Sequence, residues 1–223
     1  AIGILIIYSF LTLRQTEYWK EPVAFYKRTL QYAPRSWRFY NELGLKYVEL
    51  GNNLEAERAY QEALRINPDA LGIYFNLGGL YEKTGDRANL LVMEKLANQA
   101  KERLIRQYLE VAGQLQAAGR YRQALTEFKK ALKLDQNNLI IGFDLANLYV
   151  LMGRYNDAVN LFNKILEIKP DFALAYNNLA VAHYYLRQYD LAVANCDRAK
   201  ALGYPVEPRL INLLKLLPKM KGD

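Results

Sequence analysis

The side chains that could do chemistry in this chain are few and far apart. Its 223 residues include one histidine, His183, and one cysteine, Cys196. A catalytic nucleophile needs a base within hydrogen-bonding reach, and a metal site needs several ligands at short spacings. The sequence around these two residues supplies neither, and Asp190 and Asp197 would lie on separate turns of a helical surface as solvated carboxylates. We therefore expect no enzyme activity, no metal site and no cofactor in this chain.

The composition indicates a folded domain with a basic surface. Apolar residues make up 52% of the chain, enough for an ordinary hydrophobic core, and the net charge is +7. The single cysteine excludes an internal disulfide bond. Basic residues gather between Lys101 and Lys133. They predict either a solvated outer surface or, near Lys129 and Lys133, a face that binds anionic lipid or nucleic acid.

A pattern of apolar, glycine and proline positions recurs along the chain at an interval of about 34 residues, and it defines the elements that carry these side chains. In the clearest copy, residues 139–172, two apolar groups with three- and four-residue spacings are separated by Gly153 and followed by Pro170. Such spacings place each group on one side of a helix. Glycine supplies the left-handed residue that ends a helix, and proline cannot continue one. The copy therefore predicts two packed helices, whose facing residues are Leu145, Ala146 and Tyr149 on the first and Ala158, Phe162 and Ile165 on the second.

The same frame predicts five stacked units, because one unit cannot bury its own apolar faces. The second unit degrades in its second half, where Leu90 replaces a small residue, Glu94 an aromatic residue and Glu102 the proline. Its final turn near residues 101–104 is thus weakly encoded, and we expect a shifted or unusually long junction there. The five units are residues 37–70, 71–104, 105–138, 139–172 and 173–206.

The lone histidine and cysteine take core positions in this frame. His183 falls at the offset of Tyr149, and Cys196 falls at the offset of Phe162. Cysteine is a common small residue of protein cores. We expect a packed or hydrogen-bonded imidazole and an unreactive thiol.

Shorter elements flank the five units. Residues 16–36 read as a leading half repeat, whose helix begins at Pro22 and ends near Ala33, just before Pro34. Residues 207–223 read as a capping helix and a basic tail, because four leucines there share one side. These leucines are Leu210, Leu213, Leu214 and Leu217.

The N-terminal run differs from everything that follows. Residues 1–13 are uncharged and apolar nearly all round, and Arg14 comes directly after them. A bilayer needs about twenty such residues. We interpret residues 1–15 as the end of a transmembrane helix that begins upstream, and a buried first helix of a degenerate repeat is the alternative.

The repeat resembles the tetratricopeptide repeat. Aromatic, Leu-Gly, Tyr, Gly, Ala, aromatic, Ala and Pro positions recur in phase over residues 37–206. The resemblance implies an all-α fold, a right-handed superhelical solenoid of antiparallel helix pairs. It also implies a concave groove, lined by the first helices, that binds peptides or partner proteins.

A second resemblance covers the first thirty-six or so residues. The apolar end, the W-K-E-P sequence at residues 19–22 and P-R-S-W at residues 34–37 look like the junction in O-mannosyltransferase-type membrane glycosyltransferases with C-terminal tetratricopeptide repeats. This resemblance implies that the repeats lie on the extracytoplasmic or lumenal side and that a catalytic core precedes Ala1. The basic residues near the apolar run favour the cytoplasmic side instead. These are Arg14, Lys20, Lys27 and Arg28.

The first resemblance places offsets five, six, nine and twelve of each first helix in the groove. Amides there could hold an extended backbone, apolar side chains could form pockets, and acids favour basic ligands. The basic residues with which related repeats clamp a C-terminal carboxylate are missing, so we do not expect a chaperone tail as ligand. The predicted groove residues are Asn41, Glu42, Phe75, Asn76, Leu109, Glu110, Phe143, Asp144, Asn147, Asn177, Asn178, Val181 and Tyr184.

The leading functional hypothesis is a protein-interaction scaffold attached to a membrane through its N-terminus. Its partner would be a protein or an extended peptide with apolar and basic side chains. In one form of this hypothesis, the scaffold presents the bound segment to a glycosyltransferase core in the same parent chain. The main alternative is a soluble assembly adaptor with no attached enzyme, in which residues 1–13 pack as a repeat helix.

Overall fold

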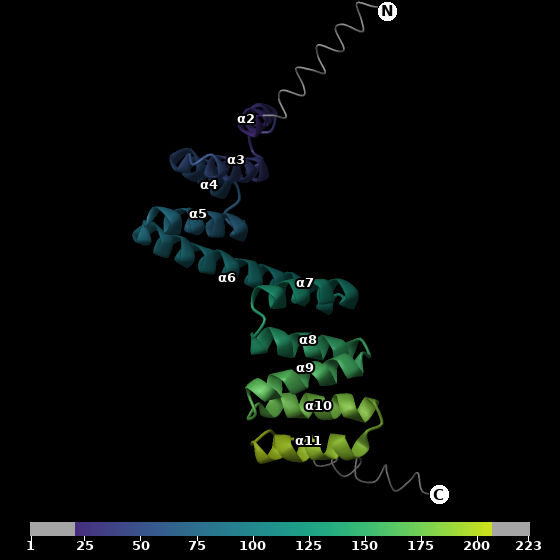
Figure 1. Cartoon of the computed structure of the whole chain (residues 1–223). Coiled ribbons are helices and arrows are strands. Elements are labelled where there is room, and N and C mark those ends of the chain that lie inside the picture. Colours follow the sequence, from purple (N-terminus) through teal and green to yellow (C-terminus); the bar gives the residue numbers. More distant parts are fainter. Residues whose placement is uncertain (1–20, 207–223) are drawn as a thin grey trace, which may run out of the picture. The chain divides into compact units, whose positions relative to one another are not determined.

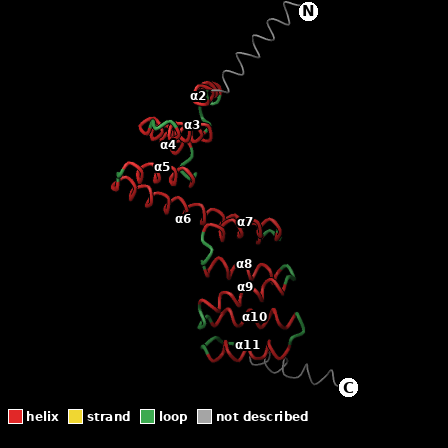
Figure 2. The backbone as a smooth tube through the Cα atoms, in the orientation of Figure 1, coloured by secondary structure: helices red, strands yellow, loops and turns green. Residues whose placement is uncertain are grey.

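The computed structural model describes residues 21–206, which fold into ten α-helices joined by short turns and contain no β-strand (Figure 1). Figure 2 shows the same helices along the backbone trace. The helices are α2 (Pro22–Tyr32), α3 (Trp37–Glu49), α4 (Asn53–Ile66), α5 (Leu71–Thr84), α6 (Arg87–Ala117), α7 (Tyr121–Leu134), α8 (Leu139–Leu151), α9 (Tyr155–Ile168), α10 (Ala173–Tyr185) and α11 (Tyr189–Ala201).

Helix ends lie where the local residue types place them. α2 begins at Pro22, at the start expected for the leading half repeat. At α8 the Oδ1 atom of Asn138 accepts hydrogen bonds from the backbone N–H groups of Ile140 and Ile141, which caps the helix. After α8 the chain turns through Gly153, whose φ is 71°. The corresponding turn after α10 contains Arg187 at φ 60°, a left-handed position without glycine.

The helices form two compact units, Ala1–Leu104 and Ile105–Asp223. In the first, α3 and α4 approach so closely that a Cβ atom on Gly44 would lie 2.6 Å from the ring of Tyr60. The Tyr60 side chain is 1% exposed and belongs to a core that includes Leu43 and Leu77. Packing along this unit therefore depends on a residue without a side chain at Gly44.

The second unit packs its helix pairs through small residues, as the repeat pattern predicts. Ala146 of α8 and Ala158 of α9 are both fully buried, next to Phe162. Small side chains at these two positions let the two backbones lie close together. The predicted facing residues of residues 139–172 thus form the centre of this core.

Helix α6 corrects the predicted order of elements. It runs for 31 residues without interruption, so the turn expected near residues 101–104 does not form. The second helix of the second repeat and the first helix of the third are one helix, whose first part lies in the first unit and whose second part lies in the second unit. The physical reason is the lack of any stop signal: no Gly or Pro stands between Arg87 and Ala112, and most residues there favour helix.

The two ends of the chain lie outside the described residues. These ends include the proposed end of a transmembrane helix, residues 1–15, and the proposed capping helix and tail, residues 207–223. Among the helices that the structure does describe, none combines the length and apolarity that a membrane span needs.

Candidate functional site

A row of three amides crosses from α8 to α10 in the second unit. The Nδ2 group of Asn178 donates to Oδ1 of Asn147 at 2.7 Å, and the Nδ2 group of Asn177 donates to Oδ1 of Asn178 at 3.1 Å. These bonds place three of the predicted groove residues on one face. Within residues 21–206, Nδ2 of Asn147 and Oδ1 of Asn177 have no protein partner, so a donor and an acceptor remain for a ligand.

The first unit repeats this pairing between α3 and α5. The Nδ2 group of Asn76 donates to Oδ1 of Asn41 at 2.9 Å. Phe75, the neighbour of Asn76 on α5, is 71% exposed, and Glu42 on α3 is half-buried. The four groove residues predicted in this unit therefore lie on α3 and α5 in pairs.

A hollow of about 440 Å³ lies beside the amide row in the second unit. It brings together three predicted groove residues, Leu109 of α6 and Asp144 and Asn147 of α8. The repeat offsets did not identify the rest of its wall, which comes from α6, α7 and the last residue of α8. These residues are Gly113, Gln116, Ala117, Tyr121, Phe128 and Leu151.

Asp144 is the charged residue of this hollow. Its side chain is half-buried, and burial raises the pKa of its carboxyl above the usual value. No hydrogen bond or ion pair joins Asp144 to any residue between 21 and 206. The carboxylate therefore faces the hollow as an acceptor that the described chain leaves unused.

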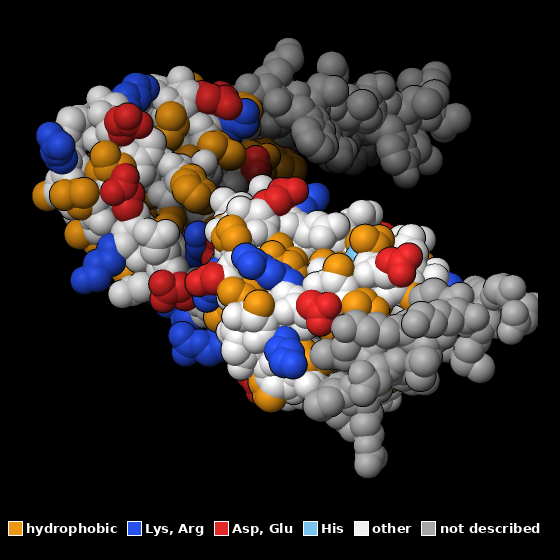
Figure 3. Space-filling view, turned by 90° about the horizontal axis from the view of Figure 1, so that it is seen from below, with side chains coloured by type: hydrophobic (Ala, Val, Ile, Leu, Met, Phe, Trp, Pro, Cys, Tyr) orange, Lys and Arg blue, Asp and Glu red, His pale blue; other side chains and the backbone are white. Residues whose placement is uncertain are grey.

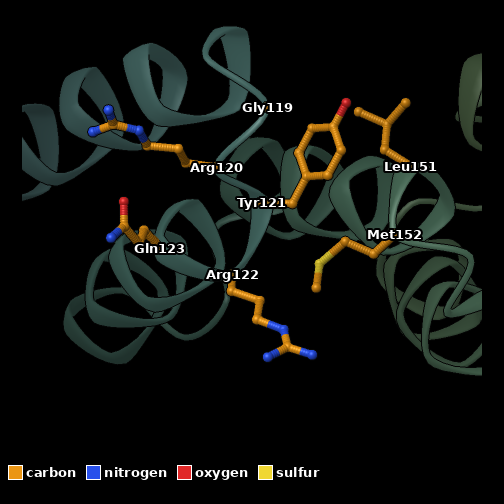
Figure 4. A pocket seen from close by; sticks show the side chains of 7 residues that line it. All are labelled: Gly119, Arg120, Tyr121, Arg122, Gln123, Leu151 and Met152. Carbon is orange, nitrogen blue, oxygen red and sulfur yellow. The ribbon is translucent and has the colours of Figure 1, made fainter.

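A second hollow of about 600 Å³ adjoins the first and shares Tyr121 and Leu151 with it. Arg120 and Arg122 line it, but Figure 4 shows their side chains pointing in different directions, away from the Tyr121 ring. Two guanidinium groups that diverge do not form an anion site.

Phe143 takes a different place from the one predicted. Its ring centroid lies 5.8 Å from that of Phe162 and 5.1 Å from that of Phe172, so it packs against the core of the second unit instead of forming a ligand pocket. Tyr184 contacts the rings of Tyr185 and Tyr189 near the end of α10.

Besides Phe143 and Tyr184, two more predicted groove residues of the second unit line neither hollow and do not belong to the amide row. Val181 is half-buried on α10, and Glu110 is exposed on α6.

His183 and Cys196 occupy the packed positions predicted for them. His183 is 7% exposed, and its Nδ1 atom lies 2.7 Å from Oε1 of Gln188. Cys196 is fully buried, which raises the pKa of its thiol and keeps it in the unreactive protonated form. Residues 21–206 contain no group of three or more His, Cys, Asp or Glu side chains that could hold a metal ion.

Charges on the outer surface are mixed in sign. Lys129 and Lys133 are exposed on α7, but Lys130 between them pairs with Glu127 at 2.7 Å. On the face drawn in Figure 3, basic and acidic side chains are interspersed among apolar ones. This distribution gives no continuous basic surface on that face.

Comparison with known families matches three intervals of the chain to tetratricopeptide-repeat models, residues 44–85, 115–180 and 172–202. The unmatched interval between the first and second of these is nearly the whole of α6, where the sequence departs from the repeat. The matched intervals also leave residues 1–43 uncovered, so they lend no support to a glycosyltransferase-like junction. No curated protein matches the chain.

Several solved structures are similar to the chain. The tetratricopeptide-repeat domain of P58(IPK) is 15% identical and has a TM-score of 0.50, over 96% of this chain and 64% of that one. YrrB, described as a tetratricopeptide-repeat protein with an unusual peptide-binding site, is 18% identical and has a TM-score of 0.43, over 87% of this chain and 97% of that one. MamA is 22% identical and has a TM-score of 0.43, over 74% of this chain and 91% of that one. Together with the ten described helices, the likeness to the P58(IPK) domain confirms the all-α solenoid fold class.

Proposed function

Because this chain is built of tetratricopeptide repeats, we propose that it is a protein-interaction scaffold that holds an extended peptide or partner segment against the first helices of its pairs. The observation that carries the proposal is the amide row of Asn147, Asn178 and Asn177. An extended backbone offers N–H and C=O groups in alternation, and a row of amides can satisfy both. Hydrogen bonds within the row fix the side chains before a ligand arrives, which lowers the entropy lost on binding.

Charge supports a preference for partners with apolar and basic side chains. The predicted groove carries Glu42, Glu110 and Asp144, and no lysine or arginine is among its predicted residues. An acidic surface attracts basic segments and repels acidic ones, even though the whole chain is basic. The exposed ring of Phe75 adds apolar contact area in the first unit.

The proposal is tested by peptide selection on the immobilised full chain. A display library of random twelve-residue peptides is the probe, and fluorescence anisotropy measures the affinity of synthesised binders. Asn178→Ala is expected to weaken binding about fivefold, roughly 1 kcal/mol, because it removes both hydrogen bonds that hold Asn147 and Asn177 in the row. Asn163→Ala, an exposed asparagine of α9, is the matched control and should bind normally.

Two results would contradict this function. One is a wild-type chain that selects no peptides above background. The other is an Asn178→Ala variant that unfolds at the wild-type temperature and binds every selected peptide with unchanged affinity. Phe143→Ala is not a suitable variant, because loss of its contacts with Phe162 and Phe172 would weaken the fold itself.

We also propose that the scaffold is attached to a membrane through residues 1–15, with the repeats on the extracytoplasmic or lumenal side. The uncharged apolar sequence of residues 1–13 supports the attachment, and the proposed side rests only on the resemblance of the first thirty-six or so residues. Carbonate extraction of membranes from cells that make the full-length parent protein tests attachment, and protease protection tests the side. Release of the intact protein by carbonate would favour the soluble adaptor instead.

A further inference from the structure

Asp144 stands apart from the comparable acids of the second unit. Among residues 105–206, four acids are half-buried, and three of them have a partner. Glu127 pairs with Lys130, Asp157 pairs with Arg154, and Asp135 accepts a hydrogen bond from Asn138 at 2.9 Å. Asp144 alone of the four has no partner among residues 21–206. A partly desolvated carboxylate without a counter-charge lowers stability, so its presence calls for a partner from outside the described chain.

The lining of the hollow around Asp144 suits a long basic side chain. Its volume of about 440 Å³ lies within the range of ordinary ligand pockets, roughly 300–1,000 Å³. Leu109, Phe128 and Leu151 provide apolar wall, and Asp144 provides the one charge. Lysine and arginine have this same division, with an apolar stem and a charged head. An apolar side chain would desolvate Asp144 further, and an acidic one would be repelled.

No cation of the described chain already fills the hollow. None of its lining residues is a lysine, arginine or histidine. Arg120 and Arg122 line the adjoining hollow, and Figure 4 shows both turned away from Tyr121. A basic side chain from a ligand would therefore meet a vacant counter-charge.

Asn147 connects the hollow with the amide row. It lines the hollow and also accepts the hydrogen bond from Asn178. A backbone held by the amides would pass the mouth of the hollow, and one of its side chains would enter. We propose that this hollow is a specificity pocket for one lysine or arginine side chain of the bound segment, with Asp144 as its counter-charge. The inference rests on the proposed peptide-binding function and adds the chemistry that selects the ligand.

The experiment compares selections on the wild-type full chain and on Asp144→Asn, which keeps the size of the side chain and removes its charge. The random twelve-residue display library is again the probe. Aligned wild-type binders are expected to carry lysine or arginine at one shared position, and binders of Asp144→Asn are expected to lose that preference. Glu167→Gln removes the same charge from an exposed position of α9 and should keep the wild-type preference.

A double-mutant cycle gives the decisive measurement. One wild-type binder is synthesised with its shared basic residue and again with norleucine at that position. The change is expected to weaken binding to the wild-type chain about tenfold and to the Asp144→Asn chain less than about twofold, because only the first retains the counter-charge. Equal losses for both chains would overturn the assignment of Asp144.

The two proposals fail in different ways. Wild-type binders without a shared basic residue would overturn the specificity pocket and leave peptide binding intact. A wild-type chain that selects no peptides would overturn both. Enrichment of lysine alone or of arginine alone would support the pocket and identify the head group that it prefers.

Discussion

The continuity of α6 can be tested by one distance. Leu91 and Gln114 lie on either side of residues 101–104, and both are exposed. They are equally far in sequence from the boundary between residues 102 and 103. At about 1.5 Å per residue, their Cα atoms lie about 35 Å apart along a continuous helix. If the chain turned back near residues 101–104, the two positions would face each other across a helix pair at about 10 Å.

Pulsed electron paramagnetic resonance measures this separation with spin labels on Leu91→Cys and Gln114→Cys. Cys196 is fully buried, so labelling is expected only at the two introduced cysteines. We expect a single distance distribution centred near 35 Å, allowing for the label linkers. A main population below about 20 Å would refute a continuous helix and restore the turn between repeats.

A second variant tests the reason given for the continuity. Glu102 stands at the offset of Pro68 and Pro170 in other repeats, and we expect Glu102→Pro to disrupt α6 because proline cannot donate its N–H and clashes with the preceding turn. The cost is about 3 kcal/mol in the interior of a helix. The label distribution should broaden and circular dichroism should report lost helix. Glu102→Ala is the control and should keep the long distance.

Three further outcomes follow from single residues. Gly44→Ala should lower the free energy of unfolding by about 1–3 kcal/mol, because its Cβ would overlap the buried Tyr60 ring. Gly79→Ala, which has open space around it, is the control and should raise that free energy by nearly 1 kcal/mol. Equal shifts of the two variants in urea titrations would contradict this difference. Arg187→Gly should stabilise the chain by about 0.5–1 kcal/mol by relieving its φ of 60°, and an unchanged or lower melting temperature would argue against strain there. Asp144→Asn should stabilise the chain at pH 7 and lose that advantage near pH 3. Burial raises the pKa of the Asp144 carboxyl in the folded state above 3.8, so the wild type loses stability as the pH rises from 3.8 through the folded-state pKa. A stability gain of the same size at both pH values would exclude the carboxyl as its cause.

The repeat pattern predicted the helix pairs because their ends and contacts depend on local residue types. Gly153 ends one helix, Pro22 begins another, and Ala146 and Ala158 meet at full burial. The pattern did not predict α6. Glu102 in place of proline and the absence of a glycine indicated a weak turn signal. Whether such a turn still forms depends on how well the two helices pack on each other, and a short stretch of sequence does not contain that information.

The candidate site was predicted in part for the same reason. Helical offsets put Asp144 and Asn147 on one face, but the rest of the hollow comes from neighbouring helices, whose placement the offsets do not contain. Phe75 and Phe143 share an offset yet differ in exposure. Phe143 packs on Phe162 of the same repeat. In the repeat that contains Phe75, the position equivalent to Phe162 is occupied by Glu94, so Phe75 has no aromatic partner there.

An uninterrupted α6 also makes the chain sensitive to length changes that repeat proteins normally absorb. A turn between repeats can lose or gain a residue by changing its loop. Each residue inserted into α6 would instead rotate the residues of this helix beyond it by about 100° about the helix axis and advance them by about 1.5 Å. Only insertions of about seven residues, close to two full turns, would return the residues of α6 beyond them to the side of the helix that they face now. The number of residues in α6 therefore fixes which of its side chains share one side of the helix, so an insertion or deletion there changes those neighbours instead of a loop.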